Sequence, residues 1–109
     1  MHVSVTTYKN DGIGANGHTY TQNCRHYGSI CAVRRHGPFR RGDRIAITSR
    51  CGQRYTATVC DIIGRKSDID LDTRSAREFM GPHYRVIGRV DATVELIYRP
   101  KHMPRYGHW

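Results

Sequence analysis

Short runs of alternating and β-branched residues, separated by turn-forming residues, most constrain how this chain can fold. The runs "VSVTTY", "SICAV", "RIAITS" and "RYTATVCD" predict strands, and "RCGQ" between the last two predicts a hairpin. We interpret "YRVIGRV" and "ATVELIY" as two further strands. About six short strands favour a small closed barrel, because closure removes the exposed edges of a sheet.

One segment, "DTRSAREFMG", predicts a helix from about Thr73 to Met80. Asp72 can accept hydrogen bonds from the first free backbone N–H groups, and Gly81 supplies a left-handed stop. The fold predicted from these patterns is mostly β with one short helix. Residues 1–98 form one domain in this interpretation, and residues 99–109 form an extended basic tail.

The charge of the chain points to anionic partners. Its 109 residues include 18 Lys and Arg against 9 Asp and Glu, a net charge of +9. A field of that sign attracts nucleic acid, acidic cell-wall polymers or anionic lipid headgroups. No apolar run approaches the roughly 20 residues of a membrane span. No signal peptide is visible either, because the first residues lack both a basic and an apolar region.

Four cysteines, Cys24, Cys31, Cys51 and Cys60, allow several structures. None belongs to a Cys-x-x-Cys pair, which argues against a zinc ribbon. We expect two disulfides, since a small domain with a modest core gains most from cross-links. Free thiols in a reducing compartment are the alternative. We predict no metal and no cofactor.

The order of these segments resembles the double-psi β-barrel domain of the rare lipoprotein A family, which is distantly related to expansins, barwin-like proteins and family-45 endoglucanases. The resemblance rests on the segments "VTTYKNDGIGANG", "VRRHGPFRRGDRIAIT", "ATVCDIIGR", "IDLDTRSAREFMG" and "VDATVELI". It extends from about Val3 to Tyr98. It implies a six-stranded double-psi barrel with a ligand-binding groove on its surface.

The resemblance also implies site residues. Asp61 ends the strand "ATVCD", where relatives carry the groove carboxylate, and His36 matches the groove histidine. In a lytic transglycosylase, one such carboxylate can act first as the acid and then as the base. Glycan contacts are expected from four further residues: Tyr8, Arg25, Arg35 and Asp70.

The chain departs from the family pattern in two places. Arg25 stands where rare lipoprotein A domains carry a glutamate, and "DIIG" replaces their "DRGP" turn. Both departures favour glycan binding without cleavage. Expansin and barwin relatives also place cysteines near Cys51 and Cys60. A local pair of Cys24 with Cys31 is slightly favoured, but the pairing stays open.

Three functions are compatible with the sequence. The preferred one is a module of the cell envelope or exterior that binds peptidoglycan, with lytic transglycosylase activity as an open addition. The second is a scaffold within an assembly, such as a phage tail or spike, that contacts other protein chains. The third and weakest is nucleic-acid binding. Its phosphate contacts would come from four arginines and its stacking contacts from two aromatic residues: Arg34, Arg35, Arg40, Arg41, Tyr27 and Phe39.

Overall fold

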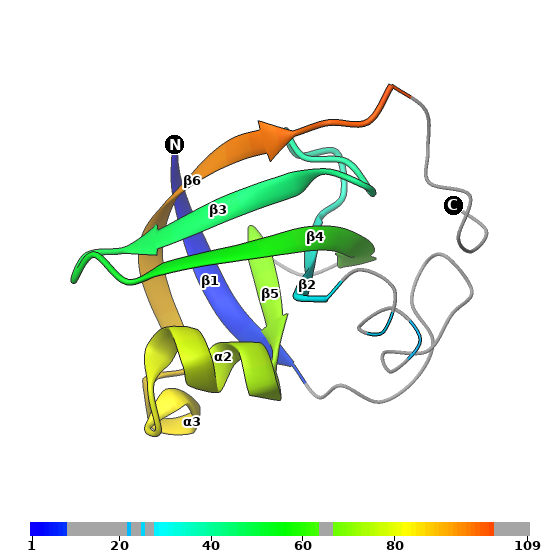
Figure 1. Cartoon of the computed structure of the whole chain (residues 1–109). Helices are drawn as coiled ribbons and strands as arrows, with labels where there is room; N and C mark the ends of the chain where they lie inside the picture. The colour runs from blue at the N-terminus through cyan, green and yellow to red at the C-terminus, as the bar shows by residue number, and fades with distance from the viewer. Residues whose placement is uncertain (9–21, 23–24, 26–27, 64–66, 102–109) are drawn as a thin grey trace.

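The computed structural model describes residues 1–8, 22, 25, 28–63 and 67–101. Strands dominate it (Figure 1). They are β1 (His2–Tyr8), β2 (Ile30–Arg34), β3 (Arg44–Ser49), β4 (Arg54–Ile63), β5 (Ile69–Asp72) and β6 (Arg89–Tyr98). The helices are α2 (Thr73–Met80) and α3 (Tyr84–Ile87). Within the described residues, no helix is long and apolar enough to cross a membrane.

The six strands form a closed barrel in the order β1-β5-β2-β4-β3-β6. β2 lies between β4, to which it is parallel, and β5, to which it is antiparallel. β1 is parallel to β5 and antiparallel to β6, and the β3–β4 hairpin joins β6 to the rest. The predicted six-stranded double-psi β-barrel with one main helix is therefore confirmed.

Alternation along each strand fills the barrel with aliphatic side chains. Val5, Ile45, Ile47, Val59 and Leu71 have no exposed surface. Each such side chain contributes about 1.5–3 kcal/mol through burial. The opposite faces of the same strands are left to carry polar groups on the outside of the barrel.

Helix α2 follows β5 directly and covers one end of the barrel (Figure 1). Asp72 is its N-cap, as predicted, and accepts hydrogen bonds from the backbone N–H groups of Arg74 and Ser75. The helix buries Ala76 and Phe79 against the core. Both the N-cap and the apolar face of α2 therefore attach the helix to the barrel.

The strand predicted for "YRVIGRV" is wrong. Tyr84–Ile87 forms the one-turn helix α3, and β6 begins only at Arg89. Gly88 separates the two with a φ of 68°, a left-handed conformation that ends a helix readily. Tyr84 is 3% exposed, so tertiary packing of this ring overrides the β propensity of the segment.

The predicted disulfides are not seen. Among the described cysteines, Cys31, Cys51 and Cys60 form no disulfide. Cys51 lies in the β3–β4 turn, whereas Cys60 lies near the far end of β4. At about 3.3 Å per residue, the strand holds these two residues some 20 Å apart, beyond disulfide reach. Cys24 lies outside the described residues.

Candidate functional site

Three aspartates share the outer face of β5 and of the residue before it. Ile69 and Leu71 point into the core. Because side chains alternate along a strand, Asp68, Asp70 and Asp72 point outward. The pattern "SDIDLD" thus builds an acidic outer face on a strand whose inner face is aliphatic.

Strand register extends this face across the barrel wall. Thr6 of β1 lies opposite Asp70, Asp70 lies opposite Ala32 of β2, and Ala32 lies opposite Asp61 of β4. We call these four residues the Asp61–Asp70 row. Neighbouring strands are about 4.8 Å apart, so the Cα atoms of the two aspartates are separated by about 10 Å. Ala32 contributes only a methyl group between them.

A β-bulge in β4 gives Asp61 its direction. Cys31 pairs with Val59, but the next residue of β2, Ala32, pairs with Asp61, so that Cys60 is an extra residue. Without the bulge, Asp61 would fall on the face that Val59 directs into the core. The bulge therefore turns a carboxylate out of the barrel within the strand. The sequence predicted that this strand ends at Asp61, whereas β4 continues to Ile63.

The two carboxylates of the row differ in accessibility. Asp70 has no exposed surface, and its Oδ1 accepts a hydrogen bond from the Thr6 hydroxyl. Ser67 Oγ lies 2.7 Å from the same hydroxyl oxygen. Asp61 is half-buried, and its Oδ1 accepts from the backbone N–H of Ile62 at 2.8 Å. A ligand outside the barrel therefore meets Asp61, while Asp70 supports the wall beneath.

The other two aspartates of β5 have structural partners. Asp72 accepts from Ser75 Oγ at 2.5 Å in addition to capping α2. Asp68 accepts from the backbone N–H of Ser4 at 2.9 Å and forms an ion pair with Arg34, with Nε and Oδ1 3.3 Å apart. These contacts hold both ends of β5 in place. Asp70, in the middle of the strand, is the β5 residue that belongs to the Asp61–Asp70 row.

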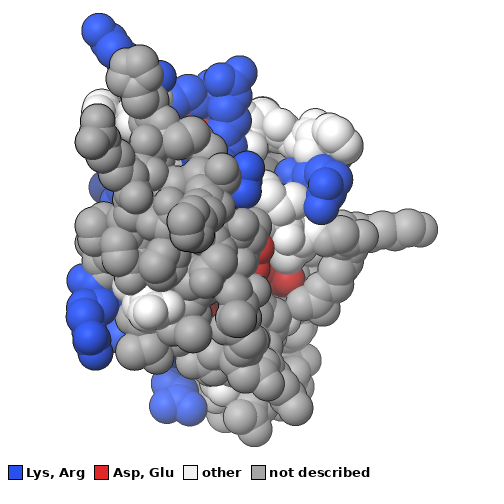
Figure 2. All heavy atoms as spheres, turned by 90° about the vertical axis from the view of Figure 1, so that its right-hand side faces the viewer, with Lys and Arg blue, Asp and Glu red and all other residues white. Residues whose placement is uncertain are grey.

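Figure 2 views the side of the barrel that lies on the right of Figure 1. Acidic atoms reach the surface near the middle of this view, and Lys and Arg side chains are gathered towards its margins. A carboxylate bordered by cations suits a ligand that offers hydroxyl donors together with negative charge.

The remaining predicted site residues are not members of the row. Tyr8 pairs with Asp72 at the end of β1, and its side chain is outside the described part of the structure. Arg25 is exposed, and it is bordered on both sides by residues that are not described. Arg35 and His36 are exposed in the turn after β2, where His36 has a left-handed φ of 62°. Their contacts with a glycan stay predictions.

Comparisons with solved structures show the fold class. Cerato-platanin 2 from M. perniciosa superposes with a TM-score of 0.67 at 16% identity, covering 90% of this chain and 95% of that chain. Cerato-platanin 3 gives a TM-score of 0.66 with the same identity and coverage. A mutant Clavibacter michiganensis expansin, in complex with cellohexaose, gives a TM-score of 0.60 at 16% identity over 94% of this chain. This chain spans about half of that expansin, 53%.

These neighbours are double-psi β-barrels, and the chain shares that fold. No protein-family model matches the chain, and no curated protein sequence matches it. At such low sequence identity, the likeness extends to the architecture of the barrel alone.

Sequence reasoning missed Thr6 and Ala32 as members of the row. In the alternating run "VSVTTY", Val5 and Thr6 lie on opposite faces of the strand. This pattern already indicated that Thr6 is on the outer face. Nothing local marked Ala32, because its place between two aspartates depends on which strands flank β2.

Proposed function

We propose that this chain binds a cell-wall polysaccharide on the outer face of β1, β5, β2 and β4, with peptidoglycan as the first candidate. The observation that supports this most is the bulge that turns Asp61 outward in line with Ala32 and Asp70. A half-buried carboxylate there can accept hydrogen bonds from sugar hydroxyls, and it is partly shielded from competing water.

The fold comparison supports the same proposal. The expansin with this barrel was crystallised with cellohexaose, a chain of glucose units. For our chain, the net charge of +9 adds a preference for glycans that carry carboxylate or phosphate groups. The proposed setting is the cell envelope or the exterior, where such polymers occur.

The two carboxylates differ in accessibility, and this difference limits how the chain could cleave a glycan. Asp61 is the accessible one, and Asp70 is buried beneath the face. Hydrolysis normally needs two carboxylates on either side of the bond, whereas a lytic transglycosylase can work with one. Any cleavage of peptidoglycan at this site would therefore use Asp61 alone and would release 1,6-anhydro products.

Sedimentation with purified peptidoglycan sacculi, and separately with cellulose, tests the proposal. The proteins compared are the wild type, Asp61→Asn and Asp91→Asn. Asp91 is an exposed carboxylate of β6 and loses the same charge on substitution. We expect Asp61→Asn to weaken binding about tenfold or more, the scale of one hydrogen bond to a charged group. Asp91→Asn should bind as the wild type does.

Mass spectrometry of the supernatant tests cleavage in the same tubes. Anhydro-muropeptides released by the wild type and not by Asp61→Asn would establish Asp61 as the acid and base. Binding without release would establish a binding module. If the wild type fails to sediment with either polymer, the polysaccharide proposal is overturned, and a scaffold role in an assembly takes its place.

A further inference from the structure

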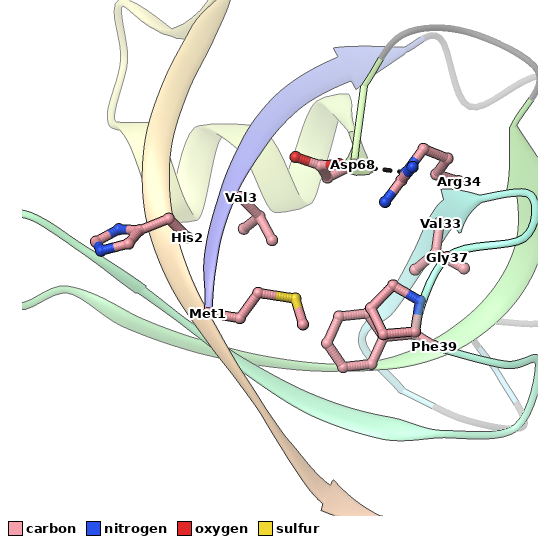
Figure 3. A pocket seen from close by; sticks show the side chains of 9 residues that line it. Met1, His2, Val3, Val33, Arg34, Gly37, Phe39 and Asp68 are labelled. Carbon is pink, nitrogen blue, oxygen red and sulfur yellow. Dashed lines mark ion pairs between the residues drawn. The ribbon is translucent and has the colours of Figure 1, made fainter.

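A cavity lies at the end of the barrel away from α2, beside the proposed glycan face (Figure 3). Its volume is about 270 Å³. Its apolar lining comes from the start of β1, the end of β2 and the turn that follows: Met1, Val3, Val33, Pro38 and Phe39. His2, Arg34 and Asp68 form the polar part of the lining, and Figure 3 shows the ion pair of Arg34 and Asp68 across the cavity from Met1 and Phe39.

Asp68 holds the guanidinium of Arg34 in place through its Nε edge. Its Nε lies 3.3 Å from Asp68 Oδ1, and Asp68 is itself fixed by the backbone N–H of Ser4 at 2.9 Å. The guanidinium also lies over Gly37, where an added Cβ would sit 3.7 Å from Nε and Nη2. The terminal nitrogens Nη1 and Nη2 have no hydrogen-bond partner among the described residues. They form a preoriented fork of the kind that binds a carboxylate through two hydrogen bonds.

The surroundings of the cavity add positive charge without local compensation. Arg35 and Arg40 are exposed in the β2–β3 connection, and neither forms an ion pair within the described part of the chain. Asp43, the acidic residue of the same connection, is buried and bonded to Arg99. An anion that approaches Arg34 therefore meets an excess of positive charge, because these three arginines outnumber the one lining carboxylate, Asp68.

We propose that Arg34 and this cavity bind an acidic sugar unit of the polysaccharide, with its carboxylate on the Arg34 fork and its apolar ring face or substituent against Phe39. This inference rests on the proposed function, because the sugar unit belongs to the chain that lies on the Asp61–Asp70 row. Arg34 follows Ala32 by two residues on the same face of β2. That spacing is about 6.6 Å, and Ala32 is buried, so the place that a ligand meets is Asp61 on the neighbouring strand. With about 4.8 Å between strands, the Cα atoms of Arg34 and Asp61 lie about 8 Å apart, within reach of adjacent sugar units of one chain.

A polysaccharide fits this site better than a nucleic acid does. Binding of single strands relies on aromatic rings that are open for base stacking. Phe39 is the aromatic residue that lines the cavity, and it is half-buried and packed against the core. Its partial burial leaves room for contact with a sugar substituent but limits the surface that a base could stack on.

The test compares two polymers with the same sugar backbone, polygalacturonate and its fully methyl-esterified form, in which a neutral methyl ester replaces each carboxylate. Titration calorimetry at fixed ionic strength would measure both with the wild type, Arg34→Lys, Arg34→Gln and Arg50→Gln. Arg50 is 83% exposed in the β3–β4 turn, so its substitution removes the same charge at a different place. Thermal melting of each variant verifies that it is folded.

We expect the wild type to prefer polygalacturonate about tenfold or more, and Arg34→Gln to remove most of that preference. Arg34→Lys should retain part of it, because lysine keeps the charge but loses the fork. Arg50→Gln should change the affinity less than about twofold. Weak binding of the ester should be the same in all four proteins.

Three results would overturn the inference. Equal binding of the two polymers by the wild type would remove the acidic specificity. If Arg34→Gln and Arg50→Gln lose the same affinity for polygalacturonate, the net charge of the protein alone explains the binding. Displacement of polygalacturonate by a lower concentration of single-stranded DNA would make this a nucleic-acid surface. Failure of the proposed function is distinguishable, since it would appear as no sedimentation of the wild type with either sacculi or cellulose.

Discussion

At the residue scale, Cys31 shows how burial alone changes the chemistry of a side chain. It is 1% exposed inside the barrel, and desolvation raises the pKa of its thiol to about 12. The positive charge of Arg44 acts in the opposite direction, towards a lower pKa, but is outweighed. Cys31 is therefore a neutral, apolar core residue at physiological pH, whereas Cys51 is exposed to solvent.

This pKa shift predicts a loss of stability in alkali. The unfolded thiol ionises near its ordinary pKa of 9.0, whereas the folded thiol keeps its proton up to about pH 12. The unfolded state is thus favoured increasingly above pH 9, and Cys31 has no such effect below it. Between pH 8 and pH 10, the free energy of unfolding should fall by about 1.4 kcal/mol on this account.

Urea unfolding of the wild type and Cys31→Ala at both pH values would measure this loss. Other groups titrate in the same range, so the difference between the two proteins is the informative quantity. Parallel losses of stability in both proteins would show that Cys31 is not responsible.

At the scale of elements, the junction of β5 and α2 depends on one carboxylate. Asp72 is the last residue of the strand and the cap of the helix, and it is fully buried. It accepts from the N–H of Arg74 at 3.1 Å and from the N–H of Ser75 at 3.4 Å. A single residue thus ends one element and begins the next.

Replacement of Asp72 by alanine should lower the free energy of unfolding by about 1–2 kcal/mol, because the first turn of α2 loses its acceptor. Asp72→Asn should cost less, since an amide oxygen can still cap the helix. The control is Glu78→Ala, which removes an exposed ion pair with Arg74 at 3.7 Å and should cost about 0.5 kcal/mol or less. Urea unfolding followed by circular dichroism gives all three values. Equal costs for the cap and the control would contradict the assignment.

At the scale of the whole molecule, an ion pair fastens the chain after β6 to the β2–β3 connection. Arg99 donates to the Asp43 carboxylate from Nε at 2.9 Å and from Nη2 at 2.7 Å. Nη2 also donates to the carbonyl of Pro38 at 3.0 Å. The hydrogen bond with Asp43 raises the pKa of Arg99. Segments far apart in sequence are thereby joined beside the cavity at this end of the barrel.

Asp43→Asn should lower the free energy of unfolding by about 1–2 kcal/mol, because the charge-assisted hydrogen bonds from Arg99 are lost, while Arg99 itself is 34% exposed and can be hydrated. Asp91→Asn breaks an ion pair with Arg50 whose side chains are 66% and 83% exposed, so it should cost less than about 1 kcal/mol. Urea titrations at pH 7 compare the two variants. If both substitutions lower the free energy of unfolding by the same small amount, the Arg99–Asp43 ion pair is not important for stability.

Much of the fold could be predicted because its signals are local. The alternation in "RIAITS" and "RYTATVCD" predicted β3 and β4, and Asp72 with Gly81 predicted the bounds of α2. The prediction failed at Tyr84–Ile87, where apolar residues compatible with a strand form one helical turn. It failed again for the disulfides, although the length of the predicted strand "RYTATVCD" already separates Cys51 from Cys60.

The candidate site was predicted only as separate residues. Asp61 and Asp70 were both named from the sequence, but their alignment across Ala32 depends on pairings between strands that are far apart along the chain. The Arg34 cavity likewise combines the start of β1, the end of β2 and Asp68. These residues are far apart in sequence, and the closure of the barrel brings them together.

The sequence by itself determined which segments extend, where the main helix begins and ends, and that the surface is basic. These properties follow from side-chain periodicity, capping chemistry and charge, which act within a few residues. Only the tertiary structure decided the strand order, the orientation of Asp61 and the state of the described cysteines. The reason is that side chains on a strand repeat every two residues, so a single bulged residue moves a carboxylate from the core to the surface.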